Sequence, residues 1–77
     1  MRKFEEWIKD VLDGVNKAKI SNMEKMAILV DLRTAKDSRK IEYINRVMKQ
    51  LHILGLAKLC PTAEEIQDWI GRGEIRI

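Results

Sequence analysis

The sequence predicts one compact, mainly α-helical domain over residues 1–77, of the small α+β class, with three to four helices and a short two-stranded antiparallel ribbon. Apolar residues recur with the 3.6-residue period of amphipathic helices through most of the chain. The segments Ser21–Glu24 and Thr62–Glu65 both fit the capping box that opens a helix. Two short segments, 56–59 and 74–77, each follow a glycine-containing turn and have the composition of strands.

The composition favours an ordered protein over a disordered one, because 45% of the residues are hydrophobic and only one is proline. Cys60 is the only cysteine, which excludes an intrachain disulfide and is typical of a reducing compartment. We therefore expect a cytoplasmic location. Acidic residues interrupt the first ten positions, and no apolar run approaches the roughly 18 residues of a membrane span, so neither a signal peptide nor a membrane partner is expected.

The first helix is predicted over residues 2–19. Its apolar positions fall on one face, and they are Phe4, Trp7, Ile8, Val11, Leu12 and Val15. Gly14 weakens this helix by about 1 kcal/mol relative to alanine. We therefore expect the helix to be least stable beyond Asp13, where it could end early.

The second helix is predicted to begin at Asn22 and to give way to a polar turn at 33–37. Its apolar residues cover more than one stripe, which requires burial on several sides. Either the other helices enclose it, or a second copy of the chain completes the core as a homodimer. The residues assigned to such a dimer or partner interface are Ile28, Leu29 and Leu32, together with Ile53 from the third helix.

The third helix is predicted over residues 38–54, with Gly55 in the left-handed conformation that closes a helix. Residues 56–59 are then a short strand. Thr62 caps a fourth helix that ends at Gly71, and the alternation of residues 74–77 predicts a second strand. Because no other strand candidate exists, we expect 56–59 to pair with 74–77.

Residues 38–59 resemble the recognition helix and first wing strand of winged helix-turn-helix transcription regulators. The resemblance lies in the apolar spacing of residues 44–51, which is followed by the Leu54-Gly55-Leu56 turn. It implies that the second and third helices form a helix-turn-helix and that the 56–59 and 74–77 ribbon is the wing. It also implies that residues 61–71 are inserted into that wing.

The face of the third helix opposite its apolar stripe carries residue types that read DNA. Arginine, asparagine and glutamine make bidentate contacts to base edges, whereas lysine neutralises phosphates. The first hypothesis is therefore a small DNA-binding transcriptional regulator, with double-stranded DNA as its partner. The residues assigned to DNA are Lys36, Arg39, Lys40, Asn45, Arg46, Lys49 and Gln50.

The same face also fits a protein partner or plain solvation. Glu42 lies four residues before Arg46 and is expected to pair with it, which would weaken an attraction to phosphate. The apolar Ile53 on this face favours a protein partner. The alternative hypothesis is a protein–protein interaction module, such as a small phage-encoded or regulatory protein that binds and modulates a larger host protein.

No set of residues in the sequence indicates catalysis. His52 has no matching metal ligands, and Cys60 has no neighbouring base to activate its thiol. There is also no nucleotide-binding loop. We therefore expect no enzymatic activity, no catalytic residues, no metal and no cofactor.

Overall fold

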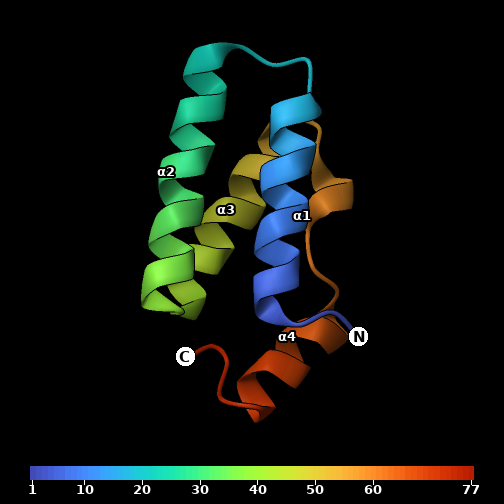
Figure 1. Cartoon of the computed structure of the whole chain (residues 1–77), viewed down its shortest axis with the longest axis vertical. Helices are drawn as coiled ribbons and strands as arrows, with labels where there is room; N and C mark the ends of the chain where they lie inside the picture. Colours follow the sequence, from blue (N-terminus) through green and yellow to red (C-terminus); the bar gives the residue numbers. More distant parts are fainter.

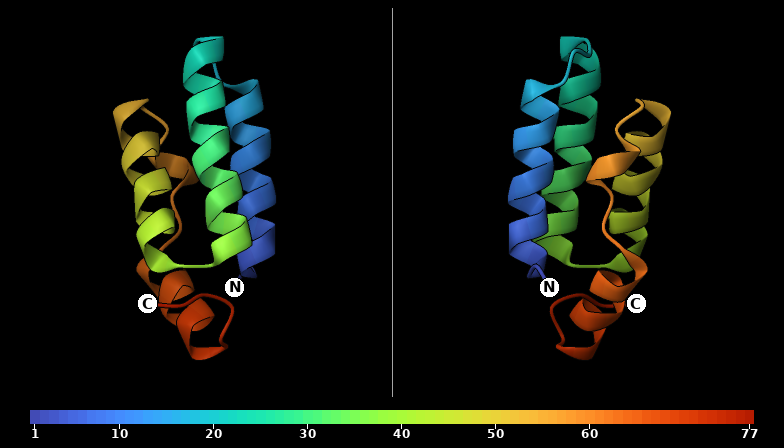
Figure 2. Two further views of the ribbon diagram at one scale, coloured as in Figure 1. Left: turned by 90° about the vertical axis from the view of Figure 1, so that its left-hand side faces the viewer. Right: turned by 90° about the vertical axis from the view of Figure 1, so that its right-hand side faces the viewer.

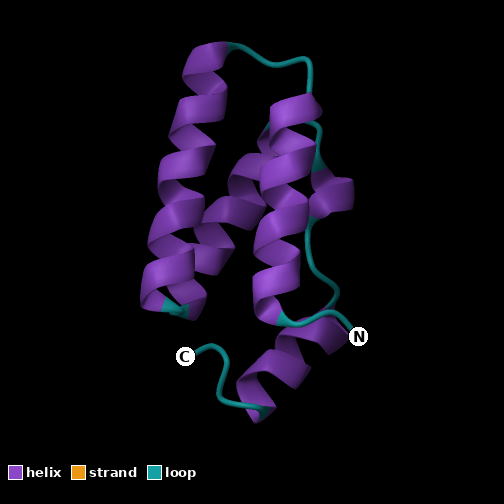
Figure 3. Ribbon diagram, in the orientation of Figure 1, coloured by secondary structure: helices purple, strands orange, loops and turns teal.

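The computed structural model describes residues 1–77 as a bundle of three helices with a fourth helix across one end (Figure 1). The elements are α1 (Phe4–Lys17), α2 (Asn22–Ser38), α3 (Ile41–Ile53), the 3₁₀ turn η1 (Ala57–Leu59) and α4 (Ala63–Gly71). Figure 3 shows that helices and loops account for the whole chain. No helix has both the length and the hydrophobicity that crossing a membrane requires.

Consecutive helices of the bundle run in opposite directions. α3 packs on one side of the α1–α2 pair, and the chain then returns through η1 between α1 and α3 (Figure 2). α4 lies across the end of the bundle where α1 begins (Figure 1). The side of the α1–α2 pair opposite α3 is covered by no element (Figure 2).

The two predicted capping boxes are confirmed. The Ser21 hydroxyl accepts a hydrogen bond from the Glu24 N–H at 3.1 Å, and the Glu24 carboxylate accepts one from the Ser21 N–H at 3.0 Å. Thr62 and Glu65 repeat the arrangement, at 3.1 and 3.0 Å. Each box satisfies amide groups that a helix start leaves without partners, which fixes where α2 and α4 begin.

The core is formed by one face from each of the three long helices, together with single residues of α4 and the C-terminal segment. Its aromatic centre is a triad in which the Phe4, Trp7 and Trp69 rings lie 5.5–6.0 Å apart between centroids. Such packing adds to the free energy that burial of the rings supplies. The buried apolar residues are Phe4, Trp7, Ile8, Val11, Val15, Ile28, Leu32, Ala35, Ile44, Val47, Leu51, Trp69 and Ile75.

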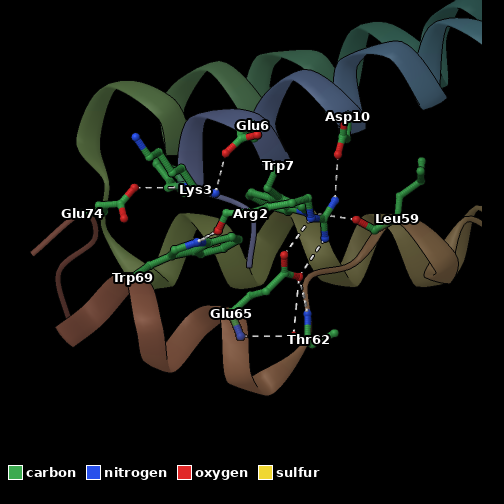
Figure 4. A network of polar contacts seen from close by, with 11 residues as sticks. Arg2, Lys3, Glu6, Trp7, Asp10, Leu59, Thr62, Glu65, Trp69 and Glu74 are labelled. Atoms are coloured by element: carbon green, nitrogen blue, oxygen red, sulfur yellow. Dashed lines mark hydrogen bonds and ion pairs between the residues drawn. The ribbon is translucent and has the colours of Figure 1, made fainter. Parts of the chain in front are cut away.

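A polar network fastens the first residues of the chain to α4 (Figure 4). The Arg2 guanidinium binds the Glu65 carboxylate through two hydrogen bonds and the Asp10 carboxylate through one. The Trp69 indole N–H donates to the Arg2 carbonyl oxygen, and the Trp7 indole N–H donates to the Leu59 carbonyl oxygen, both at 2.9 Å. Both buried tryptophans therefore have the hydrogen-bond partner that their N–H groups require.

The predicted turn at 33–37 is wrong, because α2 continues through these residues to Ser38. Ala35 faces the core with no exposed surface, so the polar residues around it are simply the solvent side of the helix. The helix ends where Arg39 takes a left-handed conformation, with φ of 59°. The third helix accordingly begins at Ile41 and not at residue 38.

The predicted ribbon between 56–59 and 74–77 is also wrong. Residues 57–59 form the 3₁₀ turn η1, because Leu56 and Leu59 both turn toward the core. The C-terminal segment instead reaches the junction between α2 and α3, where Arg76 forms a single parallel bridge with Lys40. The Arg76 N–H donates to the Arg39 carbonyl oxygen, and the Ile41 N–H donates to the Arg76 carbonyl oxygen, both at 2.7 Å. No wing is therefore present.

Candidate interaction surfaces

The outer face of α3 presents several of the residues assigned to DNA. Asn45, Arg46 and Lys49 are all exposed on it. The expected ion pair between Glu42 and Arg46 does not form; the Arg46 guanidinium lies 5.2 Å from the centroid of the Tyr43 ring instead. This stacking is a cation–π contact, which leaves the guanidinium N–H groups free to meet an external acceptor.

Lys36 and Lys40 are exposed near the junction between α2 and α3. Neither residue takes part in any of the ion pairs of the structure, and the same holds for Arg46 and Lys49. The junction and the outer face of α3 therefore carry three cations without an ion-pair partner, Lys40, Arg46 and Lys49. Lys36 instead faces α1, where it lines a hollow with Ile8 and Lys9, so the structure does not place it on the same surface.

Arg39 and Gln50 are occupied within the molecule. The Arg39 guanidinium points toward the start of α1, where it pairs with Glu5 at 3.2 Å and lies 6.0 Å from the Phe4 ring centroid. It also donates a hydrogen bond to the Glu74 carbonyl oxygen at 3.4 Å. The Gln50 side-chain amide donates to the Asp31 carboxylate of α2. The structure therefore does not bring these two residues together with Asn45, Arg46 and Lys49 as free groups on one surface.

The residues assigned to a dimer or partner interface separate into two groups. Ile28 and Leu32 lie in the core, with 0% and 4% exposure, and offer no surface to a partner. Their burial shows that the helices of one chain enclose this side of α2. Leu29 is half-buried, and Ile53 is 73% exposed on α3.

The outward side of α2 carries apolar residues that the sequence-based assignment missed. Met23, Met26 and Val30 are 83%, 68% and 63% exposed. Their spacing of three and four residues places them on one face of the helix. This spacing is visible in the sequence and could have identified them as a group. Ile53 lies beside this face, because it lines a hollow of about 230 Å³ that Ala27 of α2 also lines. We call Met23, Met26, Val30 and Ile53 the outer apolar patch.

A groove runs between α1 and α2 on the side that α3 does not cover. Its main hollow has a volume of about 410 Å³, and its lining residues are Ile8, Leu12, Leu29, Leu32, Arg33, Lys36 and Asp37. Two further hollows share residues with it: one lined by Met26, Leu29, Val30 and Arg33, and one lined by Glu5, Ile8, Lys9 and Lys36. The groove therefore joins the outer apolar patch at Met26 and Val30.

The side chains that could ligate a metal ion do not gather at one place. No group of three or more histidine, cysteine, aspartate and glutamate side chains is placed to hold a metal ion. The Cys60 thiol is partly buried and lies 3.8 Å from the Met48 carbonyl oxygen. Burial raises the pKa of this thiol, which disfavours the reactive thiolate.

These features define a small antiparallel three-helix domain with a capping helix and two open helical surfaces. No family model, curated protein or solved structure matches the chain.

Proposed function

We propose that this protein is a non-enzymatic protein–protein interaction module that binds its partner through the outer apolar patch. The observation that carries the proposal is the exposure of Met23, Met26, Val30 and Ile53, each between 63% and 83%. Large apolar side chains grouped on a small domain are typical of a surface that a partner covers. Methionine adapts to the shape of an apolar partner, because its side chain is flexible and polarisable.

The alternative of base-specific DNA reading has weaker support. A winged-helix protein contacts DNA through a wing as well as a helix, and the ribbon that would form the wing is absent. Arg39 and Gln50, which were assigned to DNA, are held by Glu5 and Asp31. Releasing either residue for DNA would cost the contacts that it already makes.

A pull-down from native cell extract tests the proposal. The wild-type chain should capture one stoichiometric protein partner, and Met26→Asp and Ile53→Asp should each abolish the capture. Arg46→Ala is the matched control on the outer face of α3 and should leave capture unchanged. Capture that persists after both aspartate substitutions would contradict the proposal. Circular dichroism of each variant checks that the helices remain folded.

Binding of double-stranded DNA through α3 is a second candidate function. The specific observation in its favour is the set of three exposed cations, Lys40, Arg46 and Lys49, that lack ion-pair partners. If each copy of a dimer neutralises about three phosphates, the logarithm of the binding constant should fall with the logarithm of salt concentration at a slope of about −5. A mobility-shift titration at several salt concentrations measures this slope. A slope near zero excludes the candidate.

A further inference from the structure

The α1–α2 groove combines an apolar floor with a basic rim. Leu12 is 43% exposed, and Leu29 is half-buried between the helices. Lys9, Arg33 and Lys36 border the hollows, are exposed, and take part in none of the ion pairs. The rim also contains the carboxylates of Glu5 and Asp37, but Glu5 is already paired with Arg39. The uncompensated charge of the rim is therefore positive.

The shape of the groove selects a helical occupant. Its walls are α1 and α2, whose backbone groups are hydrogen-bonded within each helix, so the groove has no strand edge to which an extended peptide could add. α1 has 14 residues and extends about 21 Å at the helical rise of 1.5 Å per residue. α3 fills only one side of the α1–α2 pair, and no element covers the other side, so a further helix can pack against both α1 and α2 there (Figure 1).

From these observations we propose that the α1–α2 groove binds an amphipathic helix of a partner protein, with an apolar stripe on Leu12, Leu29 and Val30 and acidic residues facing Lys9, Arg33 and Lys36. This proposal rests on the proposed function and names the chemical class of the partner segment. A second copy of the chain is a poorer occupant. In a two-fold symmetric contact centred on the groove, the same three cations of both copies would meet at one interface.

The direct test uses a defined probe. The probe is a fluorescein-labelled 18-residue helical peptide with leucines at i, i+3, i+4 and i+7 and glutamates beside them. One comparison peptide has lysines in place of the glutamates, and another has the acidic composition in scrambled order. Fluorescence anisotropy should show binding of the ordered acidic peptide, with affinity for the lysine peptide about tenfold weaker. The scrambled peptide should not bind.

Variants of the protein locate the binding. Arg33→Glu combined with Lys36→Glu should reverse the preference between the acidic and the lysine peptide. Arg46→Glu combined with Lys49→Glu makes the same change of charge on the outer face of α3 and should leave the preference unchanged. Val30→Asp should weaken the binding of the acidic peptide about tenfold, because it places a charge against the apolar stripe of the peptide. Val30 is 63% exposed, so this substitution should not unfold α2.

Several outcomes would overturn the proposal. Equal affinity for the acidic and lysine peptides, or no binding of either, would show that the groove does not select an acidic helix. A dimer by light scattering that Val30→Asp dissociates but Ile53→Asp does not would show that a second copy occupies the groove. The proposed function can stand when this inference fails: a native partner would then be lost on Ile53→Asp but retained on Arg33→Glu with Lys36→Glu. Conversely, peptide binding in the groove with no partner captured from extract would count against the proposed function alone.

Discussion

The Arg2 guanidinium grips the Glu65 carboxylate through two parallel hydrogen bonds, Nε to Oε2 at 2.7 Å and Nη2 to Oε1 at 2.8 Å (Figure 4). The two residues are 63 positions apart in the chain, so the pair joins the segment before α1 to the first turn of α4. Glu65 also accepts the Thr62 N–H in the capping box of α4. One carboxylate therefore both starts α4 and fixes it to the bundle.

We expect Glu65→Gln to lower the free energy of unfolding by about 1–3 kcal/mol, because it removes the charge that Arg2 pairs with at a largely buried position. The effect should stay below that of a fully buried pair, since the Arg2 side chain is 34% exposed and partly screened by water. Urea denaturation measures the change. Glu64→Gln, one residue earlier and exposed, is the control and should change stability by less than about 0.5 kcal/mol.

The same pair predicts how stability depends on pH. Arg2 lowers the pKa of Glu65 to about 2 from an ordinary value of 4.5. Because the folded-state pKa lies below the unfolded value, the pair stabilises the fold above about pH 4.5, and this contribution is lost as the pH falls toward 2. Urea midpoints between pH 6 and pH 2 should therefore fall more steeply for the wild type than for Glu65→Gln. If the urea midpoints of the two proteins fell equally with pH, ionisation of Glu65 would not be the cause of the lost stability.

The helices that local signals specify were predictable from the sequence. α4 was predicted correctly from Thr62 to Gly71, because the capping box and the glycine are local features. The end of α2 was not, because Arg39 takes the left-handed conformation that usually indicates glycine or asparagine. Its side chain is held there by Glu5, which is 34 residues away, so no local pattern reveals it.

The C-terminal segment likewise could be predicted only in part from local sequence patterns. The alternation in residues 74–77 predicts a half-buried strand with both isoleucines on one face, but the structure buries only Ile75, at 2% exposed, and leaves Ile77 91% exposed. The alternation does not determine the partner of the segment, since the backbone of Arg39 and Ile41 competes with residues 56–59 for the same hydrogen bonds.

Among the interaction surfaces, Ile53 was identified correctly as exposed. On α2 the interface was assigned to Ile28, Leu29 and Leu32, whereas Met23, Met26 and Val30 are the apolar residues that face solvent. Periodicity alone does not tell which side of an all-round apolar helix is exposed.

Burial of Ile75 anchors the C-terminal segment against the junction between α2 and α3. We expect Ile75→Ala to lower the free energy of unfolding by about 2–4 kcal/mol, through lost burial and the cavity that remains. Ile77→Ala is the matched control, because Ile77 is 91% exposed, and its effect should be below about 0.5 kcal/mol. Thermal or urea denaturation gives both values. Similar losses for the two variants would contradict the structural difference between these isoleucines.

Gly14 lies where η1 packs against α1. A β-carbon added at Gly14 would come within 2.7 Å of both Leu59 Cδ atoms, so alanine there must displace the Leu59 side chain. Overpacking of this kind costs about 1–3 kcal/mol, whereas alanine gains about 1 kcal/mol in helix propensity. We therefore expect Gly14→Ala to be neutral or destabilising in the wild-type chain.

A double-mutant cycle with Leu59→Ala separates the two effects of that substitution. Leu59→Ala removes the side chain that Gly14→Ala would displace, so only the helix propensity gain remains. In this background, Gly14→Ala should raise the free energy of unfolding by about 1 kcal/mol. The difference in the effect of Gly14→Ala between the two backgrounds, measured by urea denaturation, reports the contact itself. If Gly14→Ala were equally stabilising in both, Leu59 would not lie against Gly14, and the glycine would have no packing role in joining η1 to α1.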